Sequence, residues 1–394
     1  MTPSHSLEKI KVVYVITALN TGGAELALLR MLENLDLSKF SPYVISITSR
    51  GEIGALIQSI NIPLMTLDLN GWWSFPGAMI RLLNFLNKIK PEIVHTWLYH
   101  ADLLGGLVAM LARVPVIVWS IRSSNFLNRD TKNGTRIIFK LCIFFSKWVP
   151  HLVIYNSWVG LDFHKNYGYQ ESKNLVISNG VDLTKFKPNR NSRHEVRNNL
   201  GLDKHAILIG VIGRFDPLKN QIGFIEAAKH LFEIMPDVHF VMAGKDCDWN
   251  NIQIQKQLSG LSVAKNFHLL GLLQLDISLI IPALDLMTLA SVSEACPNIL
   301  LEAMACEVPC VSTNAGDSSI IIGNPAWVVP VGDMLGLAKK IKLFLDLDLD
   351  DKKYIRLKAR ERMANHFEIS NMVRLYEAQY IDLVNLNGLR KSKR

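Results

Sequence analysis

The chain has 394 residues, of which 49% are hydrophobic and 20% are charged, and its formal net charge is +8. This length exceeds what one ordinary core supports, so we expect two domains. The composition excludes a disordered, collagen-like or disulfide-stapled chain. The five cysteines form no CxxC pair and no zinc-like spacing with histidine, which indicates reduced thiols in a cytoplasmic protein.

The charge is distributed unevenly along the chain. Residues 1–200 carry +9, residues 201–350 carry −7 and residues 351–394 carry +6. No nucleic-acid-binding module accompanies the basic residues, so we expect no nucleic-acid partner. An anionic membrane surface fits better, because the basic residues alternate with aromatic ones. Ordinary solvated charges around a core remain the alternative.

No apolar run reaches the roughly 18 residues that a membrane-spanning helix needs. The longest candidates, Ile137–Val149 and Gly71–Leu86, are interrupted by lysine or arginine. Val12–Leu19 is similar to the apolar core of a signal peptide, but it is short and no cleavage site follows. It continues instead into a glycine pair that indicates a strand-to-helix turn. We therefore expect no export signal.

From the start of the chain, short apolar runs alternate with segments at helical spacing, which predicts βαβ units and a parallel sheet. In the first half we expect helices at Ala24–Leu35, Leu82–Ile89 and Leu103–Leu111. The expected strands are Lys11–Ala18, Tyr43–Thr48, Ile93–Thr96, Val116–Ile121 and Leu152–Tyr155. The segment Ile177–Asp182 is expected to be the last strand of the first lobe and to end in a turn.

The polar stretch Thr184–Asn199, which contains Pro188 and several arginines, predicts a linker. The alternation then restarts, which predicts a second doubly wound lobe and a ligand crevice between the two lobes at the carboxyl ends of the strands. The expected strands are Ile207–Ile212, Val238–Ala243, Phe267–Leu270, Leu286–Leu289 and Cys310–Thr313. The expected helices are Ile222–Phe232, Asn298–Cys306, Tyr354–Phe367 and Met372–Leu386.

The strongest motif runs from Ser291 to Met304. Glu294 lies in a loop after a strand, and Pro297 suits the first position of the following helix. The amides of Asn298 and Ile299 have no obvious side-chain cap, although Ser293 could supply one. A helix N-terminus that faces a crevice is a natural phosphate site.

Glu302 lies on the second turn of that helix, so the motif would place one carboxylate on each side of a bound diphosphate, within reach of sugar hydroxyls. The alternative is a surface acid together with a second acid favoured by the helix dipole.

A second motif follows the strand that ends at Gly213. Arg214 and Lys219 lie five residues apart in its turn and could neutralise a departing diphosphate, with Arg214 bidentate and Lys219 as a point charge. The alternative is a turn whose charges are only solvated. Gly210 and Gly213 complete no GxGxxG, so the dinucleotide-binding pattern is weak.

Three further positions follow strands of the first lobe. Gly22 and Gly23 allow close approach of the backbone to a ligand, or form only a tight turn. His100 could act on a substrate or be structural. Arg122 is a candidate anion-binding residue.

The segments GRFDPLKNQ, VMAG, HLLG and SVSEACPNILLEAMACEVPCVST together closely resemble the retaining glycosyltransferases of family 4, which have the GT-B fold. TGGAE, PEIVHTWLYHADLLGG and ISNGVDLTKF match the same family. The resemblance implies α/β GT-B architecture, with two tandem Rossmann-like domains and the ligand cleft between them. It also implies transfer of a sugar from a nucleotide-sugar, UDP- or GDP-linked, with no essential metal and no other cofactor.

By this resemblance, Arg214 and Lys219 hold the diphosphate, Glu294 positions the donor sugar and Glu302 binds the ribose. The amides near Asn298 and Ile299 assist the phosphates. The remaining implied contacts are those of Leu270 and Gly271 with the base, and of Gly22 and Gly23 with the donor from the other lobe.

The resemblance further implies an acceptor-side domain at residues 1–185, a donor domain at 186–370, and a final segment, 371–394, that packs on the first domain. This arrangement would pool the basic front and tail. We therefore expect a glycan or lipid-linked acceptor at an anionic cytoplasmic membrane face, and a role in surface polysaccharide synthesis.

Two positions depart from the family pattern. Arg122 stands where many relatives have a histidine, and Glu307 stands where relatives usually have a glycine. Three other functions remain open from the residues: a sugar-nucleotide epimerase or hydrolase of the same fold, a non-catalytic scaffold of a glycan-assembly complex, and a dinucleotide oxidoreductase.

Overall fold

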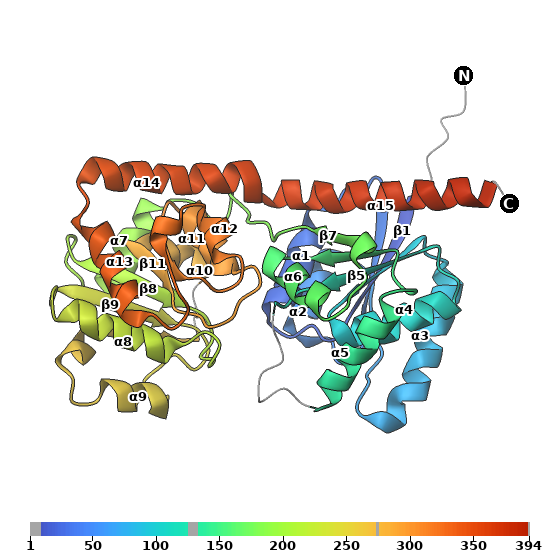
Figure 1. Cartoon of the computed structure of the whole chain (residues 1–394), viewed down its shortest axis with the longest axis horizontal. Coiled ribbons are helices and arrows are strands. Elements are labelled where there is room, and N and C mark those ends of the chain that lie inside the picture. The colour runs from blue at the N-terminus through green and yellow to red at the C-terminus, as the bar shows by residue number, and fades with distance from the viewer. Residues whose placement is uncertain (1–8, 125–132, 273–275, 393–394) are drawn as a thin grey trace, which may run out of the picture. The chain divides into compact units, whose positions relative to one another are not determined.

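The structure is a computed structural model that describes residues 9–124, 133–272 and 276–392, without the side chains of Trp72 and of residues 389–392. The chain forms two compact units (Figure 1). Unit 1 comprises the residues up to Asn179 and those from Ile369 onward, and unit 2 is Gly180–Glu368. The two boundaries expected from the sequence, after residues 185 and 370, lie a few residues further along the chain.

Unit 1 is built on a seven-stranded parallel sheet in the order β3-β2-β1-β4-β5-β6-β7. Successive residues of β1 point to opposite faces, so Val12 and Tyr14 enter one core while Val13 and Val15 enter the other. The strands are β1 (Ile10–Ile16), β2 (Phe40–Ser46), β3 (Leu64–Thr66), β4 (Ile93–Trp97), β5 (Val116–Ile121), β6 (Leu152–Tyr155) and β7 (Asn174–Val176).

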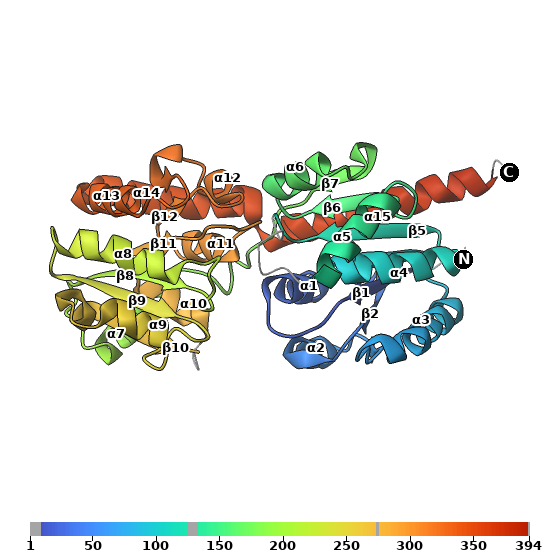
Figure 2. The same ribbon diagram turned by 60° about the horizontal axis from the view of Figure 1, so that its bottom comes forward.

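Helices cover both faces of this sheet (Figure 2). On one face lie α1 (Gly23–Glu33), α2 (Gly51–Ser59) and α15 (Ile369–Ser392). On the other lie α3 (Phe75–Ile89), α4 (Tyr99–Leu111), α5 (Asn133–Phe145) and α6 (Trp158–Asn166). Short 3-10 turns are η1 (Trp72–Ser74) and η2 (Glu171–Lys173).

The last helix, α15, is part of unit 1. Tyr376 and Tyr380 on α15 are fully buried against the sheet, and the Tyr380 hydroxyl lies 2.7 Å from Nδ1 of the buried His95 on β4. Among the described residues, no helix combines the length and apolar content needed to cross a bilayer.

Unit 2 repeats the design with six parallel strands in the order β10-β9-β8-β11-β12-β13. The sheet again separates two cores. The strands are β8 (Ile207–Ile212), β9 (Val238–Ala243), β10 (Phe267–Gly271), β11 (Leu286–Leu289), β12 (Cys310–Thr313) and β13 (Val328–Val329).

One face of this sheet packs against α8 (Gln221–Phe232), α9 (Ile252–Leu258), α13 (Met334–Asp346) and η3 (Ser262–Asn266). The other packs against α7 (Arg190–Asn199), α10 (Ile277–Ile280), η4 (Ile281–Ala283), α11 (Asn298–Ala305), α12 (Ser318–Ile322), α14 (Leu349–Arg362) and the π-helical segment η6 (Met363–Phe367). The 3-10 turn η5 (Pro325–Trp327) precedes β13.

The linker expected at Thr184–Asn199 is wrong over its second half, because residues 190–199 form α7. The Asn189 side chain caps this helix by accepting a hydrogen bond of 3.1 Å from the amide of Ser192. Val196 and Arg197 are buried in the core of unit 2. The polar composition suggested a linker, but tertiary ion pairing supports a helix here.

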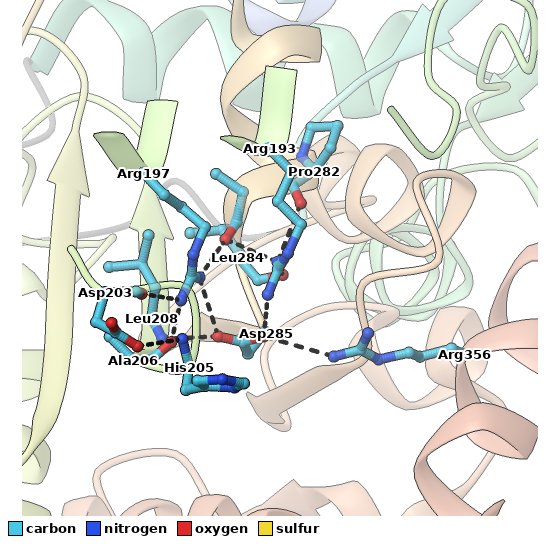
Figure 3. A network of polar contacts seen from close by, with 11 residues as sticks. Arg193, Arg197, Asp203, His205, Ala206, Leu208, Pro282, Leu284, Asp285 and Arg356 are labelled. Carbon is cyan, nitrogen blue, oxygen red and sulfur yellow. Dashed lines mark hydrogen bonds and ion pairs between the residues drawn. The ribbon is translucent and has the colours of Figure 1, made fainter. Parts of the chain in front are cut away.

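That ion pairing centres on Asp285, just before β11 (Figure 3). Its carboxylate lies 2.6 Å from Arg193, 3.3 Å from Arg197 and 3.6 Å from Arg356, and also accepts the amide of Leu208 at 2.9 Å. The arginines come from α7 and α14, so one carboxylate fixes two helices at the amino edge of the sheet (Figure 3).

Candidate active site

The strand order of unit 2 reverses between the neighbouring strands β8 and β11, since β9 and β10 continue on one side and β12 and β13 on the other. In open α/β sheets, ligands bind outside the carboxyl ends of the strands at such a reversal. The loop after β8 carries Arg214 and Lys219, and the loop after β11 carries Glu294. The fold therefore brings the two strongest sequence motifs to one point.

Lys219 and Glu294 form a direct ion pair across these two loops. The Lys219 Nζ lies 2.7 Å from Oε1 and 2.9 Å from Oε2 of Glu294, and the Ser291 hydroxyl donates to Oε1 at 2.7 Å. The side chain of Glu294 is only 9% exposed, whereas that of Lys219 is 30% exposed. The Glu294 carboxylate is thus buried and fixed by Ser291, while the Lys219 ammonium is partly exposed to solvent.

Backbone contacts fix the two loops relative to each other. The amide of Val292 donates to the carbonyl of Leu218 at 2.8 Å, and the Asn220 side chain donates to the carbonyl of Ala290 at 3.2 Å. Gly316, with φ of +58°, lies so close that a Cβ there would be 2.5 Å from the carbonyl oxygen of Glu294. Glycine is therefore required for the loop of Glu294 to lie where it does.

Arg214 is paired with Asp216 in its own loop. The distances to Oδ2 of Asp216 are 3.1 Å from Nε and 3.0 Å from Nη2, and the Arg214 side chain is 61% exposed. Because the guanidinium is exposed to solvent while the Asp216 side chain is 22% exposed, the ion pair is screened and contributes little free energy. The guanidinium can therefore exchange Asp216 for an incoming anion at small cost.

Helix α11 begins at Asn298, the first residue of the expected range, so Pro297 is not the first helical residue as its type suggested. Pro297 occupies the N-cap position, with φ −71° and ψ 101°, and Asn298 is the first helical residue. No side-chain hydrogen bond caps the helix from Pro297. Ile299 and Glu302 on this helix are both buried, so Glu302 has little contact with bulk water.

Leu270 and Gly271 end β10, and hydrogen bonds join Gly271 to the loop after the neighbouring strand β9. The amide of Gly244 donates to the carbonyl of Gly271 at 2.8 Å, and the amide of Gly271 donates to the carbonyl of Cys247 at 2.9 Å. Gly213 in turn donates to the carbonyl of Ala243 at 2.8 Å. The carboxyl edge of the sheet is thus closely packed from β10 to β8.

In unit 1 the strand order reverses between β1 and β4. Gly22 is the N-cap residue of α1, directly before Gly23, and both follow β1. His100 is the second residue of α4, which follows β4, and burial lowers the pKa of its imidazole. Gly22, Gly23 and His100 therefore follow the two strands next to this reversal.

Arg122, after β5, is engaged by its own unit. Its guanidinium stacks 4.5 Å from the ring centre of Trp97 and donates to Oδ1 of Asn179 at 2.6 Å and to the hydroxyl of Tyr376 at 3.3 Å. The sequence analysis identified none of these three partners. They lie 25 to more than 250 residues away in the chain, and no local pattern points to them.

Asp216 and Gly316 were also missed. A side chain two residues after Arg214 in a turn commonly accepts backbone hydrogen bonds, so Asp216 could have been identified from GRFD. Within the described ranges, no group of three or more His, Cys, Asp or Glu side chains is placed to hold a metal ion.

Comparison with solved structures shows the fold class. The Anabaena protein Alr3699/HepE, solved in complex with UDP, aligns with a TM-score of 0.83 at 19% identity, over 95% of this chain and all of that one. A glycosyltransferase from Rickettsia africae aligns with a TM-score of 0.82 at 19% identity, over 96% of this chain and 99% of that one. The two-sheet architecture is thus that of the GT-B proteins.

Family models then identify the chain itself. The model "Glycosyl transferases group 1" matches residues 192–365, and "Glycosyltransferase Family 4" matches residues 21–185. The two models together match most of the chain. The chain belongs to the glycosyltransferases that these two models describe, as the sequence motifs predicted, and it is a glycosyltransferase.

Two curated relatives are similar over most of their length. The Escherichia coli UDP-Gal:alpha-D-GlcNAc-diphosphoundecaprenol alpha-1,3-galactosyltransferase is 29% identical over 315 residues, which are 78% of this chain and 79% of the relative. The Staphylococcus aureus capsular polysaccharide biosynthesis glycosyltransferase CapM is 23% identical over 321 residues, 77% of this chain and 80% of the relative.

Proposed function

We propose that this glycosyltransferase takes a sugar from a UDP-linked donor, bound at the carboxyl edge of unit 2, and transfers it to a saccharide carried on a polyprenyl diphosphate. The reaction would serve surface polysaccharide synthesis at the cytoplasmic side of a membrane. The name of the E. coli relative supports this choice of donor and acceptor, and the UDP complex of the Anabaena protein supports the base.

The observation that carries the proposal is the Lys219–Glu294 ion pair at the strand-order reversal. Without donor, the carboxylate neutralises the ammonium. When a diphosphate enters, Lys219 can turn to a phosphate oxygen and stabilise the charge that grows as the glycosyl bond breaks. Glu294, still held by Ser291, then accepts hydrogen bonds from the donor sugar.

The other candidates complete this assignment. Arg214 exchanges Asp216 for the diphosphate, and the N-terminus of α11 at Asn298 and Ile299 adds its dipole. Glu302 binds the ribose, and Leu270 with Gly271 borders the base. Unit 1 contributes to donor and acceptor binding through Gly22, Gly23, His100 and Arg122.

Charge stabilisation by two cations and a helix N-terminus needs neither a protein nucleophile nor a divalent metal. Metal independence and retention of the anomeric configuration are therefore part of the proposal. Retention rests on the family resemblance alone.

Donor choice is tested by a thermal-shift panel of UDP-, GDP-, ADP- and TDP-sugars, followed by transfer assays with GlcNAc-diphosphoundecaprenol. We expect the largest rise in melting temperature with a UDP-sugar, and a product that forms only when the acceptor is present. A GDP-sugar giving the largest rise would overturn the choice of base. Release of free sugar or an epimer without acceptor would instead indicate a hydrolase or epimerase.

The role of Glu294 is tested by Glu294→Gln. Because this residue is assigned to the sugar and not to the diphosphate, we expect transfer to fall about 10²–10³-fold while UDP binds at least as tightly as to the wild type. Glu233→Gln, an exposed residue just after α8, should leave both unchanged. If Glu294→Gln transferred the sugar at the wild-type rate, Glu294 would not be part of the donor site.

A membrane contact is also part of the proposal, and it is assigned to the outer face of α5. Ile137, Leu141 and Phe144 are exposed there at helical spacing, and the exposed Trp148 follows them, with rings of Phe144 and Trp148 4.8 Å apart. Exposed lysines alternate with this apolar stripe. An apolar stripe with cations beside it is typical of helices that lie in an anionic bilayer surface.

Sedimentation with phosphatidylglycerol vesicles tests this contact. Wild-type protein should bind these vesicles more strongly than phosphatidylcholine vesicles, and less as salt rises. Phe144→Ser with Trp148→Ser should weaken binding, whereas Trp249→Ser, which changes an exposed tryptophan of unit 2, should not. Binding that is indifferent to salt, to anionic lipid or to the α5 variant would contradict the assignment.

A further inference from the structure

Unit 2 contains a cavity of about 380 Å³ that none of the donor-site assignments uses. Its lining includes Pro309 and Cys310 at the start of β12, and Trp327 just before β13. It therefore lies toward the amino edge of the sheet, whereas the loops of Lys219 and Glu294 follow the carboxyl ends of β8 and β11. The volume is within the range of small-ligand sites, about 300–1,000 Å³.

One wall of the cavity is a row of side chains four residues apart along α14 and η6. These are Tyr354, Lys358, Arg362 and His366. Residues spaced by four lie on one side of a helix, so the spacing gathers a ring and two permanent cations at one surface. Unit 2 as a whole has a formal net charge of −1, so this concentration of positive charge is local.

Arg362 is held in place without using all of its donors. Its Nε donates to the carbonyl of Ile321 at 2.8 Å and its Nη2 to that of Ile320 at 2.6 Å, which caps the end of α12. A Cβ at Gly323, where φ is +72°, would be 2.5 Å from the guanidinium carbon. Among the described residues Nη1 makes no hydrogen bond, so it is available to a ligand.

Lys358 is more loosely held. It pairs at 2.6 Å with Glu361, the one acid among the described residues that line the cavity, and both side chains are about half exposed. Such a pair contributes little free energy, so Lys358 can turn to an anion in the cavity. The adjoining π-helical turn η6 presents His366 to the same space, and π-helical turns often occur at functional sites.

The remaining lining is suited to a sugar ring. Tyr354 and Trp327 supply aromatic rings against which the apolar face of a pyranose can pack, and Asn324 supplies an amide. Aromatic rings, an amide and two cations in one cavity match a ligand that has both a sugar ring and a negative charge.

We propose that this cavity is a second ligand site that binds an anionic saccharide, a sugar bearing a phosphate or a carboxylate, through Lys358, Arg362, Tyr354 and Trp327. The site is separate from the donor site. It does not depend on the proposed donor or acceptor.

Calorimetric titration of the full chain with glucose 1-phosphate and with glucuronate tests the proposal, with glucose and inorganic phosphate as comparisons. We expect at least one of the two anionic sugars to bind at least about tenfold more tightly than glucose or phosphate. Glucose lacks the negative charge, and inorganic phosphate lacks the sugar ring. The affinities for glucose 1-phosphate and glucuronate distinguish a phosphorylated from a carboxylated ligand.

Variants locate the binding. Lys358→Ala and Tyr354→Ala, both at exposed positions, should each weaken it about tenfold or more. Lys353→Ala on the same helix, outside the lining, should not, and Lys219→Ala should leave it intact. The proposal is overturned if neither anionic sugar binds, if inorganic phosphate binds equally well, or if Lys219→Ala removes the binding while Lys358→Ala does not.

Discussion

Glu307 follows the last turn of α11 with φ of +59°, in the left-handed region. A side chain with a Cβ costs about 1–2 kcal/mol there, while glycine loses roughly 0.5–1 kcal/mol through its greater freedom in the unfolded chain. We therefore expect Glu307→Gly to raise the free energy of unfolding by about 0.5–1 kcal/mol in urea denaturation. Glu307→Ala keeps the Cβ and should bring no such gain; an equal gain from both variants would exclude backbone strain as the cause.

His164, buried in unit 1, gives the second prediction at this scale. Burial lowers its pKa to about 4, against the opposing effect of its hydrogen bond to the carbonyl of Gly160. The unfolded state then binds more protons than the folded state between pH 6.5 and 4. The contribution of His164 to the free energy of unfolding is therefore complete above pH 6.5. It falls as the pH drops toward 4, by about 3 kcal/mol.

Urea denaturation as a function of pH measures this loss. His164→Gln should lower stability at pH 7, because the hydrogen bond of 2.6 Å with the Tyr99 hydroxyl is altered, but its stability should fall less steeply below pH 6.5. Burial also lowers the pKa of His95. Because His95 is present in both proteins, it contributes equally to the pH dependence of both. Identical pH slopes for the two proteins would contradict the prediction.

Sequence motifs selected the candidate residues but not their partners. Lys219 and Glu294 were both predicted to contact the donor, since each stands in a recognisable local motif. Their pairing was not foreseen, because they are 75 residues apart and meet only when β8 and β11 become neighbours. The partners of Arg122 were missed for the same reason.

Among the elements, the buried strands were predicted best. Six strands have the bounds expected from the sequence, namely β5, β6, β8, β9, β11 and β12. Strands that are covered on both faces have continuous apolar sequences, so their ends are easy to recognise. Helix α7 was missed because its composition is polar and its stabilising contact, Asp285, lies far along the chain. No local pattern reports such a contact.

The Asp285 network gives the prediction at this scale. Arg197 is buried, and Asp285→Asn removes its counter-charge along with that of Arg193 and Arg356. Leaving a buried charge without its partner typically costs 3–5 kcal/mol, so we expect a loss of about 3 kcal/mol in the free energy of unfolding, measured by denaturation of the full chain.

Asp276→Asn is the matched control. Asp276 pairs with Lys185, and both side chains are nearly half exposed, so that variant should cost less than about 1 kcal/mol. Asparagine also keeps the cap of α10, where Asp276 accepts the amide of Ser278. Equal losses for Asp285→Asn and Asp276→Asn would show that the network does not stabilise unit 2.

For the whole molecule, the division into units corrects the expected distribution of charge. The tail was expected to add its +6 to the first lobe, but six of its basic residues lie on α14 in unit 2. Unit 1 nevertheless carries +9 and unit 2 −1. The family and the two sheets were predictable because motifs span nearly the whole chain, whereas the assignment of α14 required the packing of Ala359 and Met363 into the core of unit 2.

The most direct test of the account is the dissociation constant of UDP, measured by calorimetry for wild type, Lys219→Ala and Lys256→Ala. Lys219→Ala removes the cation assigned to the diphosphate and leaves Glu294 to repel it, so UDP should bind at least about tenfold more weakly. Lys256→Ala, at an exposed position on α9, should bind UDP as the wild type does. Unchanged affinity in Lys219→Ala would contradict a donor site at the reversal between β8 and β11.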